Sequence, residues 1–304
     1  MRDRMTIAIA GFLLASGGVA MAQQPQQPAA PVPSSGWVGS IDFGGRLNGV
    51  DGDHARYERY RDLRDGASTR MSLSKETDEY VFSANLESIG YRDQRYRATY
   101  DHSGKVKLTF LWDSIPFNYS YASSTPWVEE SPGVFTLDRA ARLLVQNRAP
   151  GVIGLAASAS QLDTPSIYRG LASPFDIQAR RDSAGVAGTF MATKDLAINV
   201  AFTSTGKSGH EPKGASFGFS VAGQLPVPLD NRTNDISAAA EWLNKQAMFR
   251  VAWDGSWFKN SIHEILFDNP VRADDTTPID TSGYSNGRGA ARNRMAAPPS
   301  NSRF

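Results

Sequence analysis

The feature that most constrains the fold is a period-two alternation of apolar and polar residues that recurs along the chain. The segments KVKLTFLWD (105–113) and LAINVAFT (196–203) are clear examples. Successive side chains of a β-strand point to opposite faces, so each such segment has one apolar and one polar face. We find roughly ten segments of this kind, at the length of about 9–11 residues that crosses a bilayer when tilted. The pattern predicts an all-β, antiparallel sheet.

The connections between these segments distinguish two ways of burying the apolar faces. Short turns such as HSG (102–104), TKD (193–195) and NKQ (244–246) alternate with long loops rich in Gly, Asp, Ser and Pro. A soluble sandwich turns its apolar faces inward, whereas a membrane barrel turns them outward to lipid. Short turns on one side, long loops on the other and aromatic residues near strand ends favour a transmembrane β-barrel. A secreted β-sandwich binding module remains the alternative and would partition into water without detergent.

The longest connection, between 114 and 180, loses the alternation and contains one predicted helix. This helix is expected from Leu137 to Asn147, with Asp138 or Thr136 as its N-cap. Its apolar side is expected to carry Ala140, Leu143 and Leu144.

The N-terminus has the pattern of a secretory signal peptide. Arg2 and Arg4 precede an apolar run over 7–19, and small residues then predict cleavage after Ala22, so that residues 1–22 are removed. Residues 23–36, QQPQQPAAPVPSSG, predict a flexible leader. Barrel strands and loops are expected over 37–268, followed by a loop-like tail over 269–304.

Composition excludes several classes of protein. The 32 Lys and Arg residues balance 31 Asp and Glu residues, so the chain has no basic excess for nucleic acid. Cysteine is absent, which excludes disulfides, thiolate metal sites and covalently attached c-type haem. Four scattered histidines lack a second ligand at metal spacing, and no nucleophile has a base and an orienting group beside it. We therefore expect no metal site, no bound cofactor and no enzyme.

The stretch VDGDHARYERYRDLRDG (50–66) is the most charged part of the chain. It contains Asp51-Gly52-Asp53, but the further ligands and the final Glu of an EF-hand are missing. A polar loop or strand end, hydrated or facing the lumen, is the favoured interpretation. The alternative is contact with acidic groups of a protein partner through Arg56, Arg59, Arg61 and Arg64. On the barrel interpretation, a second set of basic residues faces the lumen: Arg95, Arg97, Lys105 and Lys107.

Several segments resemble the MtrB/PioB family of decahaem-associated outer-membrane proteins. The likeness begins at GSIDFGGRLNGVDGDHARYERYRDLRDG (39–66) and continues through YVFSANLESIGYRDQRYRATYDHSGKVKLTFLWDSIPFNYS (80–120). It reappears at FDNPVRADDTTPID (267–280) and RMAAPPSNS (294–302). The chain departs from the family in lacking a CxxC near the mature N-terminus and in being much shorter.

This resemblance implies a large barrel in the bacterial outer membrane that sheathes a multihaem c-type cytochrome and lets electrons cross. The chain has no CxxCH motif and too few histidines for a haem series, so the haems would belong to the partner. A diffusion porin without a cytochrome is the alternative function.

Two further expectations concern the wall itself. Val200 and Phe202 should face lipid, while Asn199 and Thr203 should face the lumen. The last convincing strand ends near Phe267, because the segment AAPPSNS (296–302) does not alternate and two prolines cannot donate to a ladder. An open edge in lipid leaves backbone groups unpaired. The chain is therefore expected to be an incomplete, N-terminal portion of a barrel.

Overall fold

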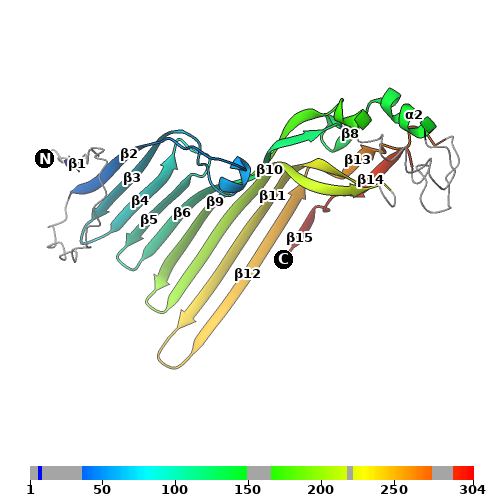
Figure 1. The fold of residues 1–304 in the computed structure, drawn as a ribbon. Helices are drawn as coiled ribbons and strands as arrows, with labels where there is room; N and C mark the ends of the chain where they lie inside the picture. The colour runs from blue at the N-terminus through cyan, green and yellow to red at the C-terminus, as the bar shows by residue number, and fades with distance from the viewer. Residues whose placement is uncertain (1–5, 9–35, 149–165, 218–221, 276–289) are drawn as a thin grey trace.

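The computed structural model describes residues 6–8, 36–148, 166–217, 222–275 and 290–304. An eleven-stranded sheet forms a continuous wall, and a four-stranded unit lies beyond one end of it (Figure 1). The short hairpin turns all lie at the lower end of the wall in this view, which we call the turn end, and the long connections lie at the opposite loop end. The alternation therefore predicted the correct fold class.

The wall is antiparallel at every pair except β1 with β2, which are parallel. No helix among the described residues is long and apolar enough to span a membrane. In spatial order the wall contains β1 (Thr6–Ala8), β2 (Trp37–Arg46), β3 (Gly66–Glu76), β4 (Val81–Ile89), β5 (Arg95–His102), β6 (Val106–Thr125), β9 (Ser173–Thr193), β10 (Leu196–Ser216), β11 (Ala222–Leu243), β12 (Met248–Asn260) and β15 (Asn301–Arg303).

No backbone pairing joins the two ends of the wall among the described strands, so the sheet is open, as expected for an unclosed part of a barrel. Strand β1 falls within the segment predicted to be a signal peptide, where it pairs with Val38–Ser40 of β2. Cleavage after Ala22 remains a prediction, because residue 22 lies outside the described residues.

The central strands are longer than the sequence predicted. β6, β9, β10 and β11 contain 20, 21, 21 and 22 residues, about twice the length that crosses a bilayer. Hydrogen bonding continues at the loop end after the apolar alternation has stopped, and the pattern alone could not show this.

The four-stranded unit has the spatial order β14 (Arg292–Ala296), β13 (Glu264–Asp268), β8 (Val134–Thr136) and β7 (Val128–Ser131). Helix α2 (Arg139–Arg148) belongs to it, and the side chain of Asp138 accepts a hydrogen bond from the N–H of Ala141 at 2.7 Å, as an N-cap does. The core joins residues from distant parts of the chain, including Trp127, Phe135, Val145, Phe217, Leu225 and Phe267.

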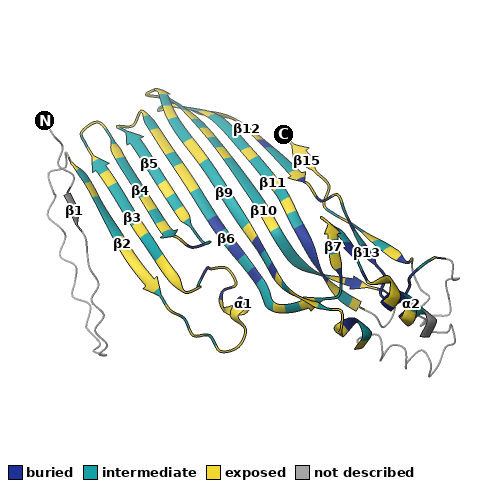
Figure 2. Cartoon of the chain, turned by 90° about the horizontal axis from the view of Figure 1, so that it is seen from above, coloured by how far each residue is buried: buried dark blue, intermediate teal, exposed yellow. Residues whose placement is uncertain are grey.

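Two expectations for this region were wrong. Helix α2 buries Ala141 and Val145, whereas Leu144 is 42% exposed and Ala140 is exposed. The tail over 269–304 contains β14 and β15 rather than loop alone, although 297–300 around the two prolines is not a strand. In both cases a tertiary partner, the core or a neighbouring strand, outweighed the local pattern. Buried residues gather in this unit and at the loop end of the wall (Figure 2).

Candidate functional site

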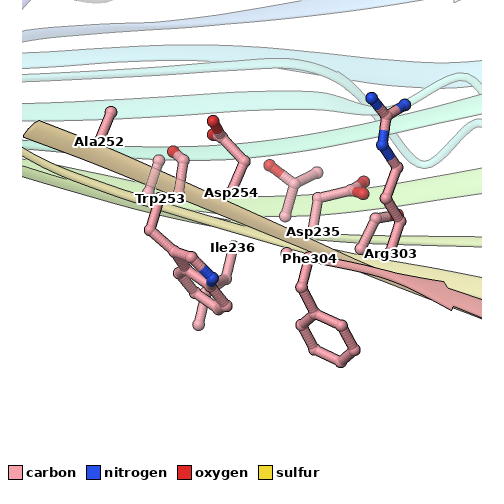
Figure 3. A pocket seen from close by; sticks show the side chains of 12 residues that line it. Asp235, Ile236, Ala252, Trp253, Asp254, Arg303 and Phe304 are labelled. Carbon is pink, nitrogen blue, oxygen red and sulfur yellow. The ribbon is translucent and has the colours of Figure 1, made fainter.

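The half of the wall near the short turns has one polar and one apolar face. Val200 and Phe202 are 50% and 38% exposed on the apolar face, and they alternate with Asn199 and Thr203. Figure 3 shows the same division on β11 and β12. Ala252, Asp254, Asp235 and Arg303 project from one side, and Trp253, Ile236 and Phe304 project from the other. The polar face is the candidate functional surface, since on the barrel interpretation it faces the lumen.

Short side chains cover most of this polar face. They form cross-strand hydrogen bonds between Ser40 and Ser72 at 2.8 Å and between Ser83 and Thr99 at 2.6 Å. The hydroxyl of Thr189 donates to Oδ1 of Asn199 at 2.7 Å. Between these pairs lie further small residues in register, namely Thr109, Ser183, Gly185, Ala187, Ala201, Thr203, Ser237, Ala239 and Ala252. The middle of the wall, on β9 and β10, therefore presents a hydroxyl-rich surface with little side-chain bulk, and charged side chains flank it on β5, β6, β11 and β12.

One predicted lumen residue, Arg95, is held by an ion pair within the wall. Its Nε lies 2.9 Å from Oδ1 of Asp113, and Nη2 of Arg181 lies 3.3 Å from Oδ2 of the same carboxylate. β5, β6 and β9 are neighbours, so this Arg–Asp–Arg cluster connects three strands. The carboxylate of Asp113 therefore offsets part of the positive charge of Arg95 within the wall.

The other three predicted lumen residues lie nearer the short turns. Arg97, Lys105 and Lys107 are exposed, and no ion pair or side-chain hydrogen bond is formed by them among the described residues. Arg97 and Lys107 line a hollow of the polar face together with Asp101. The structure therefore separates Arg95, which is paired, from three basic side chains that are available to a ligand.

The charged stretch 50–66 folds against the free edge of β6. β5 begins only at Arg95, so the loop-end half of β6 has no strand neighbour on that side. There the N–H of Asn118 donates to the carbonyl of Arg59 at 3.0 Å, and its Nδ2 donates to the carbonyl of Glu58 at 2.7 Å. Helix α1 (His54–Tyr57) begins this segment. The stretch thus covers a strand edge, which is a structural role that neither sequence interpretation included.

The carboxylate of Asp62 holds this segment in place. Its side chain is fully buried and accepts hydrogen bonds from Nε and Nη2 of Arg64, both at 2.8 Å, and from the N–H of Arg92 at 2.7 Å. Burial raises the pKa of this carboxyl, but the hydrogen bonds and charges of Arg64 and Arg92 outweigh burial and lower it overall. Arg64, which the alternative interpretation assigned to contact with a partner, is therefore engaged inside the chain.

The remaining arginines of the stretch are more accessible. Arg61 is 68% exposed and lies 3.6 Å from Asp93, the guanidinium of Arg59 lies 5.7 Å from the centre of the Tyr119 ring, and Arg56 is exposed on α1. Among the described residues no group of three or more metal-ligating side chains is present.

Protonation of Asp62 should release the stretch. Because its folded-state pKa is lowered, the stabilisation is present at neutral pH and is lost as pH falls below the ordinary value of 3.8. Asp62→Asn should lower the free energy that holds the stretch 50–66 in place by about 1–3 kcal/mol at neutral pH. The variant should also lose the release of this stretch that occurs as pH falls in the wild type. Limited proteolysis of 47–65 between pH 7 and pH 3 measures it, with exposed Asp51→Asn as the control. An Asp62→Asn protein with the wild-type pH profile contradicts the role of Asp62.

The wall and its connections define the class of protein. An antiparallel wall with an exposed apolar band, short turns at one end and long loops at the other is that of a porin-like transmembrane β-barrel. The family model described as "Putative outer membrane beta-barrel porin, MtrB/PioB" matches residues 50–304. The chain belongs to this family and resides in the outer membrane, which confirms the resemblance seen in the sequence. The family is one of porins rather than of enzymes. No curated protein matches the chain.

Sequence reasoning missed Asp113, Asp62 and Asn118 as the partners of the predicted basic residues. Asp113 was visible as a polar-face position opposite Arg95 once the β5–β6 hairpin was recognised. The pairing of Asp62 with Arg92 and that of Asn118 with Glu58 gave no local signal, because the partners lie 30 and 60 residues apart.

Proposed function

We propose that this barrel is a sheath that holds a multihaem c-type cytochrome, so that electrons cross the outer membrane through the enclosed protein. The observation that carries the proposal is the covering of the polar face by Ser, Thr, Ala and Gly side chains. A surface without bulk allows another protein to approach the backbone closely along β9 and β10, in the middle of the wall.

The distribution of charge supports the same role. Asp113 offsets one of the two positive charges of Arg95 and Arg181, whereas Arg97, Lys105 and Lys107 form no ion pair among the described residues at the turn end. Basic side chains suit the haem propionates or acidic surface of a cytochrome. The haems belong to that partner, since this chain has no cysteine for the thioether bonds of c-type haem.

The test compares added bulk on the two faces of one strand. Ala201→Trp places an indole on the polar face, and the neighbouring Val200→Trp places it on the exposed apolar face. The tagged barrel is purified from membranes of its source organism, and the co-purified haem is measured by peroxidase staining. A sheath predicts that wild type and Val200→Trp retain haem, whereas Ala201→Trp loses most of it.

A diffusion porin predicts a different result. The purified wild-type protein would carry no haem and would form a steady open channel in planar bilayers, and Ala201→Trp would alter only its conductance. That outcome overturns the proposed sheath function and establishes the diffusion-porin function, for which the same hydrophilic wall is suited.

A further inference from the structure

We infer that only the turn-end part of the wall lies in the membrane, and that the loop-end parts of β6, β9, β10 and β11 project as a free-standing extension into water. The lipid headgroups then contact the wall along the line where the exposed face changes from apolar to polar. This inference rests on the barrel fold of the family and does not depend on whether the lumen holds a cytochrome.

The first observation is a change in polarity along a single face. On β10 this face carries Ile198, Val200 and Phe202 and then continues with Ser204 and Ser208. β6 changes after Trp112, where Ser114 follows on the same face, and β12 changes after Trp257, where Lys259 follows. The apolar band is therefore limited in height on each of these strands.

The second observation is that these changes lie side by side. Backbone pairing aligns Ser114 with Asp182, Asp182 with Gly206, Gly206 with Arg232 and Arg232 with Lys259. One row of small and charged residues thus crosses five strands, directly beyond Trp112 and Trp257 and one step beyond Ser204 and Asn234 on β10 and β11. Asp182 forms an ion pair with Arg180 at 2.8 Å, and Arg232 is exposed. Charged side chains on the lipid face are costly in the hydrocarbon core, so this row lies outside it.

The third observation is length. The 21 residues of β10, at about 3.3 Å per residue, span roughly 70 Å. A hydrocarbon core about 30 Å thick requires only roughly 40 Å of strand at a 45° tilt. Roughly 30 Å of strand must therefore project beyond the lipid, which agrees with the position of the polar row.

Aromatic residues mark the boundary itself. Tyr96 and Trp112 are direct cross-strand partners, and Trp257 is paired with Asn234 in the same row of the sheet. Each lies one step before the polar row on the apolar face. Tyr and Trp rings prefer the headgroup level of a bilayer, so a phospholipid or lipopolysaccharide headgroup fits this line.

The extension is built as a water-exposed structure. The free edge of β6 is covered by the segment around Asp62, and Phe117 on the opposite face packs against the ring of Tyr60 at 5.6 Å. Beyond it, the four-stranded unit has its own apolar core. These features satisfy backbone groups and bury apolar side chains without lipid.

The chain lacks cysteine, so single cysteines report their surroundings without background. Val200→Cys, Ser204→Cys and Ser208→Cys lie on one face of one strand. After reconstitution of the full chain into phosphatidylcholine vesicles, a charged, membrane-impermeant maleimide should label Ser208→Cys at least about tenfold faster than Val200→Cys, because charge is excluded from the hydrocarbon core. Both sites should react equally after unfolding in hot SDS.

A second measurement on the same variants does not depend on thiol reactivity. Nitroxide labels at the three sites should show high accessibility to oxygen at position 200 and to a water-soluble nickel chelate at position 208, with position 204 between them. The inference is overturned if positions 200 and 208 are equally protected from the maleimide. It is also overturned if the oxygen and nickel-chelate accessibilities place the labels at positions 200 and 208 at the same depth. Matching protease resistance of the variants establishes that each has folded.

Discussion

Replacing Arg142 with Met should unfold the four-stranded unit while leaving the wall intact. The guanidinium of Arg142 is buried, with Nη1 2.8 Å from Oδ2 of Asp268 and Nε 3.2 Å from the carbonyl of Asn269. Its Nη2 donates to two further carbonyls, of Arg272 at 2.9 Å and Ala291 at 2.5 Å. Removing one partner from such a buried pair costs about 3–5 kcal/mol.

Hydrogen exchange measures this effect directly. In Arg142→Met, amides of α2 and β13 should lose protection, while those of β10 in the wall should not change. Arg139→Met is the matched control, because Arg139 is an exposed arginine of the same helix. Unchanged protection of β13 in Arg142→Met would show that the buried contacts of Arg142 do not hold the four-stranded unit together.

Val200→Arg should prevent stable insertion of the wall. Val200 is 50% exposed on the apolar face, in the band that we place in lipid. An arginine on the lipid face near the bilayer midplane costs about 2–4 kcal/mol. The measurement is the urea midpoint of folding into phosphatidylcholine vesicles, followed by heat-modifiable migration on gels.

Asn199→Arg is the control for this prediction, because the side chain of Asn199 lies on the polar face and meets Thr189. Losing that hydrogen bond costs about 1 kcal/mol, and the added charge remains in water. Equal destabilisation by both substitutions would remove the assignment of the two faces.

The sequence was informative where each face of a strand keeps one environment. From Leu196 to Thr203 the alternation gave the strand, its turn and both faces. Beyond Phe202 the same face enters water, so the pattern ends although the ladder with β9 and β11 continues. Periodicity reports the solvent around a strand, and it therefore underestimates a strand that passes from one solvent to another.

Long-range contacts were the second limit. The burial of Asp62 depends on Arg92, thirty residues later, and the burial of Arg142 depends on Asp268. The alternative interpretation placed the arginines of 50–66 against acids of a protein partner, whereas Arg61 and Arg64 pair with Asp93 and Asp62 of this chain. Whether those acids belonged to this chain or to a partner could be decided only by the fold.

The pairing of β8 with β13 has a consequence for the order of assembly. Most wall strands pair with their neighbours in sequence, so each hairpin can join the growing edge with little loss of chain entropy. Phe135 of β8, in contrast, aligns with Phe267 of β13, and four long wall strands are synthesised between them. Closing this long segment costs less chain entropy once β9 to β12 have paired with one another, so we expect the four-stranded unit to form late, and its formation would report that this part of the wall has been built.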